Sequence, residues 1–176
     1  MTENTSSKFS LDTTGATFAF LLFRLWLGTR SFATGIEKFA GIETRQTPLL
    51  DEFGEEDISG AMVTVKAKVY GFEHYHGLPK PLFDKFAEEP LMPLWMLNLY
   101  SSILGYALIL LGILLFTGAL PRLTLFASGL LYTSLTVGLI LLNESGGVAW
   151  LATHIIMIAA ALLLVKYNKF SLYNKL

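Results

Sequence analysis

Apolar residues along the chain are concentrated in four long runs, which are separated by turns and by one long polar segment. The runs cover approximately residues 16–39, 94–116, 120–142 and 148–167. A helix needs about 20 apolar residues to cross the hydrocarbon core of a bilayer, which is about 30 Å thick. The pattern therefore predicts an all-α integral membrane protein, in which residues 1–176 form a single membrane domain built as a four-transmembrane-helix bundle.

The segments between the last three runs are short. Pro121 is well placed for the first turn of a helix, and residues 143–147 are rich in turn formers. Short connections place consecutive helices side by side and antiparallel. We therefore expect the second, third and fourth helices to be sequential antiparallel neighbours.

The segment 42–92, between the first and second runs, is long for a connection in so small a protein. Residues 61–70 alternate valines with polar residues, which is typical of a strand, but no hairpin partner is evident. Residues 81–95 predict a short amphipathic helix on the membrane surface. The first half of the segment is acidic and contains Asp51, Glu52, Glu55, Glu56 and Asp57. We expect this loop to form an outer cap over the polar face of the first helix.

Composition and charge exclude several classes of function. Charged residues make up 15% of the chain and hydrophobic residues 53%, whereas a soluble domain carries about 25% charged residues. The net charge of −1 is unlike that of a basic nucleic-acid-binding surface, so no nucleic-acid partner is expected. The chain has no cysteine, which excludes thiol catalysis and any Cys-ligated metal or cluster.

The distribution of cations predicts the orientation in the membrane, because Lys and Arg are enriched in cytoplasmic loops. One side of the predicted bundle carries Lys8, Arg122, Lys166, Lys169 and Lys175. The cations of the long loop are outnumbered by its acidic residues. We therefore place both termini in the cytoplasm and the long loop outside, in the cytoplasmic (inner) membrane of a bacterium or archaeon.

The first run is two-faced when it is drawn as a helix with about 100° between successive residues. One stripe carries small and charged residues, namely Arg24, Gly28, Ser31, Gly35 and Lys38, with Arg30, Thr34 and Glu37 beside it. The opposite side is apolar and consists of Phe18, Leu22, Leu25, Phe32, Ile36 and Phe39. We expect the apolar side to face lipid. The small residues Ser31 and Gly35 should contact Ser101 and Gly105 of the second helix.

The charges of the first helix are candidates for a binding site. A charged side chain at mid-membrane costs at least about 3 kcal/mol, so such residues normally face the interior of a bundle. We hypothesise that Arg24, Arg30, Glu37 and Lys38 line a polar site for an anion, a quinone carbonyl or a substrate headgroup. The alternative is structural: Arg24 and Lys38 would extend to opposite interfaces, and Arg30 would pair with Glu37.

Three histidines add further candidates. His154, the only histidine inside a predicted span, could bind a quinone or shuttle a proton, or simply bond to a neighbouring helix. A bis-His haem would need a second intramembrane histidine, which the chain lacks. His74 and His76 would share one face of an extended strand, as a metal site requires, but a solvated loop is the favoured interpretation.

The segments 23–28 and 35–39 resemble the first span of the DoxX/DoxD family. In that family this span typically has an Arg-Leu-x-x-Gly element, then a glycine, then a lysine near the outer end. The matching residues are Arg24, Gly28, Gly35 and Lys38. Four spans, a variable first loop and short later connections also fit the family, and the length of the loop in this chain is closer to the DoxD branch.

The resemblance implies a membrane subunit linked to redox chemistry. DoxD-like proteins form the larger subunit of a thiosulfate:quinone oxidoreductase, with a smaller single-span partner. Without cysteine, this chain would depend on cations such as Arg30 and Lys38 to bind thiosulfate, and on a bound quinone or a partner to accept electrons. We therefore expect a membrane subunit of a quinone-linked oxidoreductase. The alternatives are a non-enzymatic accessory or anchor subunit, with the loop as its docking surface, and a small transporter.

Overall fold

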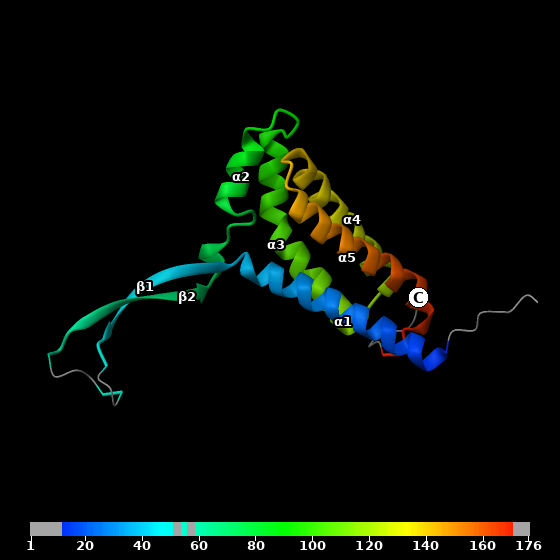
Figure 1. Cartoon of the computed structure of the whole chain (residues 1–176), viewed down its shortest axis with the longest axis horizontal. Coiled ribbons are helices and arrows are strands. Elements are labelled where there is room, and N and C mark those ends of the chain that lie inside the picture. Colours follow the sequence, from blue (N-terminus) through cyan, green and yellow to red (C-terminus); the bar gives the residue numbers. More distant parts are fainter. Residues whose placement is uncertain (1–11, 51–53, 56–58, 171–176) are drawn as a thin grey trace, which may run out of the picture.

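The computed structural model describes residues 12–50, 54–55 and 59–170, and this part of the chain is mostly helical (Figure 1). The bundle is formed by α1 (Thr13–Glu37), α3 (Leu94–Thr117), α4 (Pro121–Leu141) and α5 (Ser145–Leu164). Between α1 and α3 lie the strands β1 (Ala40–Pro48) and β2 (Met62–Tyr70), the 3-10 turn η1 (Phe72–His74) and the short helix α2 (Lys80–Ala87). A second 3-10 turn, η2 (Val165–Tyr167), follows α5.

The four long helices lie where the four apolar runs predict helices. Within the described residues, three helices are long and apolar enough to cross a membrane: Leu94–Thr117, Pro121–Leu141 and Ser145–Tyr167. Helix α1 is as long as these, but it carries Arg24, Arg30 and Glu37. The membrane character of the chain therefore rests on α3, α4 and α5.

Glycines allow α1 and α3 to pack closely and antiparallel. A Cβ atom added at Gly35 would lie 2.7 Å from Cγ1 of Ile109 and 3.0 Å from the carbonyl oxygen of Gly105, which confirms the predicted contact between the two glycines. A Cβ atom added at Gly112 would lie 2.7 Å from Cβ of Phe32. Phe32, which we expected to face lipid, therefore packs into this interface because Gly112 leaves room for it.

Helices α4 and α5 form the second closely packed pair. Helix α1 contacts α5 as well as α3, whereas the consecutive helices α3 and α4 touch at few positions. The main apolar core consists of Phe20, Leu27, Leu115, Leu125, Tyr132, Ile158 and Ala161. The sparse contact between α3 and α4 leaves space in the bundle near α2.

Strands β1 and β2 form an antiparallel hairpin, so the all-α prediction is wrong in this segment. The register pairs Ala40 with Tyr70 and Pro48 with Met62. The predicted alternation of valines lies in β2, but β1 has no regular apolar pattern. Its strand conformation comes from backbone hydrogen bonds to β2, which depend on no side-chain pattern. For that reason the sequence does not reveal the partner strand.

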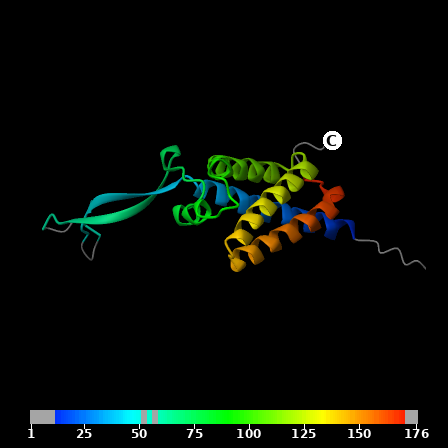
Figure 2. The ribbon, with the colours of Figure 1, turned by 90° about the horizontal axis from the view of Figure 1, so that it is seen from above.

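The hairpin projects away from the side of the bundle (Figures 1 and 2). Its strands are exposed except at a few positions near the base. The expectation that the acidic loop caps the first helix is therefore wrong for the described part of the hairpin. Of the acidic residues, Glu55 is exposed, and Asp51, Glu52, Glu56 and Asp57 lie outside the described residues.

Helix α2 covers the bundle in place of the hairpin. It is shorter than the predicted helix over 81–95, because the segment between Ala87 and Leu94 contains Pro90 and Pro93, and Pro93 becomes the residue that caps the start of α3. Phe86 is buried, and a Cβ atom added at Gly138 of α4 would lie 3.0 Å from its ring. The apolar side of α2 thus packs against the bundle.

Candidate functional site

A large apolar cavity, here called the chamber, lies between α2 and the adjacent ends of the four long helices. Its volume is about 640 Å³, which falls within the range of about 300–1,000 Å³ that is usual for small-molecule sites. The lining includes side chains from α2, from α3 and from the segment that joins them, among them Leu82, Phe86, Met92, Met96, Leu104 and Leu108. The chamber is therefore suited to a molecule with a substantial apolar body.

Helix α1 supplies a polar stripe to one side of the chamber. Arg30, Thr34 and Lys38 recur every four residues, which places them on one face of the helix. The guanidinium carbon of Arg30 lies 5.8 Å from the ring centroid of Trp150, a distance at which a cation–π contact forms. No carboxylate is among the residues that line the chamber. The charge presented to the chamber is therefore positive.

Arg30 and Lys38 carry no salt bridge in the described part of the chain. The Arg30–Glu37 pair that the sequence left open is not formed, because both carboxylate oxygens of Glu37 lie 2.7 Å from Nζ of Lys68. Tyr70 donates a further hydrogen bond of 3.3 Å to Glu37. The bond to Glu37 raises the pKa of Lys68. The base of the hairpin thus engages the acid of α1 and leaves the two cations free.

A second, polar cavity adjoins the chamber and is here called the vestibule. Its volume is about 530 Å³, and it shares Arg30, Thr34 and Lys38 with the chamber. Glu37 and His76 also line it. A ligand could therefore place an apolar body in the chamber and a polar head beside the cations, in contact with the vestibule.

One hydrogen bond crosses the chamber wall between α3 and α4. The hydroxyl oxygens of Tyr100 and Ser134 are 3.0 Å apart, and both residues line the chamber. Sequence reasoning did not select either residue. The only signal is that each is a polar side chain within an apolar helix, and such side chains commonly bond across helices in membranes.

Arg24 lies away from the chamber. Its Nη1 donates a hydrogen bond of 2.7 Å to Oδ1 of Asn168, just after η2, and its side chain is buried. Asn168 in turn donates to the carbonyl oxygen of Gly118 at 3.5 Å. Arg24 therefore links α1 to the C-terminal end of the helical region, and it is not grouped with Arg30 and Lys38.

His154 is buried in the core and does not line the chamber. Its Nδ1 lies 2.9 Å from the carbonyl oxygen of Trp150 in the same helix. Because a carbonyl oxygen can only accept, Nδ1–H is the donor of this hydrogen bond. The imidazole stacks at 5.3 Å from the ring of Tyr132, whose hydroxyl lies 3.1 Å from Oγ of Ser31. The hydroxyl of Ser31 is therefore within hydrogen-bond distance of α4, a contact that its position in the small-residue stripe did not predict.

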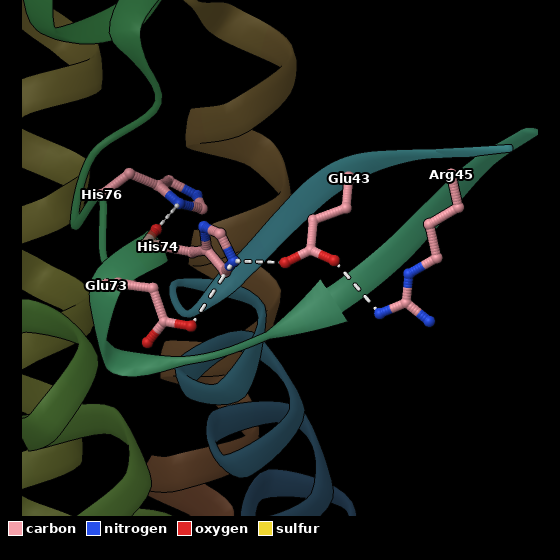
Figure 3. A network of polar contacts seen from close by, with 5 residues as sticks. All are labelled: Glu43, Arg45, Glu73, His74 and His76. Carbon is pink, nitrogen blue, oxygen red and sulfur yellow. Dashed lines mark hydrogen bonds and ion pairs between the residues drawn. The ribbon is translucent and has the colours of Figure 1, made fainter. Parts of the chain in front are cut away.

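His74 and His76 lie at the base of the hairpin (Figure 3). His74 is in the turn η1, so the two imidazoles do not share the face of a strand as the sequence suggested. Nε2 of His74 lies 3.8 Å from Glu43 and 3.7 Å from Glu73, whereas Nδ1 of His76 bonds to the backbone oxygen of His74 at 3.1 Å. Within the described residues, no group of three side chains is arranged to hold a metal ion.

Comparison with known proteins adds no family to this picture. No protein-family model, curated protein or solved structure matches the chain. The resemblance to the DoxX/DoxD family therefore rests on the residues of the first helix. The chamber and its two cations are the observations on which a functional proposal has to stand.

Proposed function

We propose that the chain is a quinone-binding membrane subunit of a quinone-linked oxidoreductase, with thiosulfate as the electron donor. The observation that carries the proposal is the apolar chamber, in which the charged lining residues are the two cations Arg30 and Lys38. The resemblance of the first helix to the DoxX/DoxD family adds the redox context and the choice of donor.

The chemistry of a quinone matches the lining of the chamber. A quinone has an apolar ring and tail, and two carbonyl oxygens that accept hydrogen bonds. The side chains of Arg30 and Lys38 can only donate hydrogen bonds, which is what a carbonyl oxygen requires. Met92 and Met96 provide flexible side chains that adapt to ligand shape. The ring carbonyl would lie at the polar stripe of α1, and the tail would lie among the leucines of α2 and α3.

The proposal includes α1 as a fourth span, in addition to α3, α4 and α5. Its 25 residues give a length of about 37 Å at 1.5 Å per residue, which exceeds the hydrocarbon thickness. The Arg24–Asn168 bond places the first half of α1 beside the segment that follows α5, so the start of α1 and the end of α5 lie toward the same end of the bundle. We place that end in the bacterial or archaeal cytoplasm, and the chamber at the outer side of the inner membrane.

Binding of a short-chain quinone to the purified protein in nanodiscs tests the proposal. Arg30→Met and Lys38→Met should each weaken binding about tenfold, because a hydrogen bond from a charged donor contributes about 1.5 kcal/mol or more. Arg122→Met is the matched control, since Arg122 is an exposed cation at the start of α4 that does not line the chamber. Equal affinity in all four proteins would contradict a quinone site at Arg30 and Lys38.

The electron donor needs a separate measurement. Thiosulfate-dependent reduction of the same quinone should occur in the purified protein, or after addition of its single-span partner, and should fall in Arg30→Met. Quinone binding without any thiosulfate-dependent reduction would reject the donor but keep the quinone site.

A second candidate function is a non-enzymatic accessory or anchor subunit of a larger membrane complex. The observation that favours it is the exposed hairpin, which extends away from the bundle (Figure 1). This function predicts that a different protein co-purifies in fixed ratio, and that it is lost when residues 43–67 are replaced by a short Gly-Ser linker. It also predicts that the purified chain does not bind quinone.

A further inference from the structure

The hairpin of β1 and β2 has no neighbouring strand in the described part of the chain. The sheet has two strands only, and both strands are exposed along most of their length. An isolated two-stranded hairpin is marginally stable in water. Exposed strand edges are also templates for pairing with another chain. A further strand is therefore the kind of partner that this segment fits.

We propose that β1 pairs antiparallel with β1 of a second copy of this chain, with Thr44 of both copies at the two-fold axis. The two hairpins then form one four-stranded sheet in the order β2–β1–β1–β2. Thr44 is the midpoint of Ala40–Pro48, so this register pairs the whole strand.

The charges of β1 are self-complementary in this register. Within one copy, Nη2 of Arg45 lies 3.1 Å from Oε2 of Glu43 on the same exposed strand (Figure 3). In the proposed register Glu43 also lies opposite Arg45 of the second copy, and Arg45 lies opposite its Glu43, so the pair within each copy becomes a cluster of four alternating charges. Opposite charges directly across two strands stabilise the pairing, and like charges destabilise it. Centring the pairing on Glu43 or on Arg45 instead would place two identical charges opposite each other. Charge therefore selects both the second copy as partner and Thr44 as the centre.

The edge of β2 lacks this complementarity. Its midpoint is Lys66, so a symmetric pairing of two β2 strands would place Lys66 opposite Lys66. Lys68 adds a further positive charge to this strand, and the described residues of β2 contain no acidic residue to balance it. The β1 edge is therefore the one suited to a second copy.

The placement of the hairpin leaves room for both bundles. It projects from the side of the bundle in two perpendicular views (Figures 1 and 2). Antiparallel pairing sets the base of one hairpin beside the far end of the other, so the two bundles lie at opposite ends of the joined sheet. Pro48, which lacks an N–H group, lies at the end of the strand, where it disturbs the fewest ladder bonds.

Single-cysteine cross-linking in membranes tests the proposal, since the natural chain has no cysteine. Opposite residues of antiparallel strands have Cα atoms about 4.5 or 5.5 Å apart, within the range of about 4.4–6.8 Å that a disulfide spans. Thr44→Cys should therefore form a disulfide-linked dimer on mild oxidation. Thr64→Cys is the matched control: Thr64 is also exposed, but it lies on β2, and in the proposed sheet the two copies of β2 are three strand spacings apart.

Charge reversal in the Thr44→Cys background separates pairing between copies from contacts within one copy. Glu43→Arg alone and Arg45→Glu alone should each reduce the cross-linked fraction several-fold, because both create like-charge pairs. Mixing differently tagged copies of these two variants should restore a mixed dimer, since 43 and 45 are then oppositely charged across the axis. The arrangement does not depend on the quinone site, so the melting temperature of each variant in detergent, compared with that of the unaltered chain, serves as the check that the variant is folded.

Three results would overturn the proposal. The first is a folded Thr44→Cys protein that does not cross-link. The second is equal cross-linking of Thr44→Cys and Thr64→Cys, or no recovery in the mixed pair. The third is a Thr44→Cys disulfide to a different protein, which would show that another partner occupies the β1 edge.

Discussion

At the scale of single residues, the environment of each cation on α1 decides what it can do. Arg24 is buried and bonded to Asn168, so its role is to hold α1 against the segment that follows α5. Arg30 and Lys38 face a chamber without a carboxylate partner in the described residues, so they remain available to a ligand. The three residues carry the same charge, so the sequence alone did not separate Arg24 from Arg30 and Lys38. The difference depends on which part of the fold each side chain contacts.

The same limit applies to His154 and Glu37. The sequence placed His154 inside a span, but only the fold shows that its Nδ1 bonds within α5 and that it does not line the chamber. Glu37 was predicted beside Arg30, yet its partner Lys68 lies thirty-one residues away in the hairpin. Contacts made across such separations depend on tertiary structure and could not be deduced from helical periodicity.

Gly35→Ala should destabilise the protein by about 1–3 kcal/mol, because its new Cβ would meet the backbone of Ile109 at 2.8 Å and overpacking of a close contact costs about that much. Gly146→Ala is the matched control, since nothing lies within 4 Å of its added Cβ. Thermal unfolding in detergent measures both. A melting temperature of Gly35→Ala at or above that of Gly146→Ala would contradict the close packing of α1 on α3.

At the scale of elements, the sequence predicted the long helices well and the segment between α1 and α3 poorly. Apolar runs located α1, α3, α4 and α5, because a helix in or near lipid must carry a continuous apolar surface. Strand β1 was not predicted because it has no alternating apolar pattern. It is held as a strand by backbone hydrogen bonds to β2, which leave no signal in the sequence. The amphipathic pattern of α2 is compatible both with a helix on a membrane surface and with a helix that covers an apolar chamber. The sequence therefore predicted a helix but not the surface that it covers.

Phe86→Ala tests the role of α2 as the cover of the chamber. Removing this buried ring should weaken quinone binding and speed quinone dissociation, because Phe86 lines the chamber and packs near Gly138. A loss of stability of about 3–5 kcal/mol is also expected for a buried Phe→Ala change. Phe72→Ala is the control, since Phe72 is 79% exposed. Stopped-flow release of quinone from both variants provides the comparison, and equal release rates would exclude α2 as a cover.

At the scale of the whole molecule, two regions serve two purposes. The bundle and α2 line the chamber, and three helices of the bundle have the composition of membrane spans. The hairpin reaches sideways from the bundle (Figure 1), and Lys68 at its base binds Glu37 at the end of α1. In the account proposed above, the bundle holds the quinone and the hairpin holds the second copy.

Photolabelling with an azido-quinone tests the central proposal, the quinone site in the chamber, most directly. After irradiation in nanodiscs and peptide mass spectrometry, the labelled residues should cluster on the chamber lining, at positions such as Leu82, Leu104 and Val137. An excess of unmodified quinone should abolish that labelling. Labelling confined to the exposed side chains Phe18 and Leu22 of α1, or labelling that excess quinone does not reduce, would contradict the account.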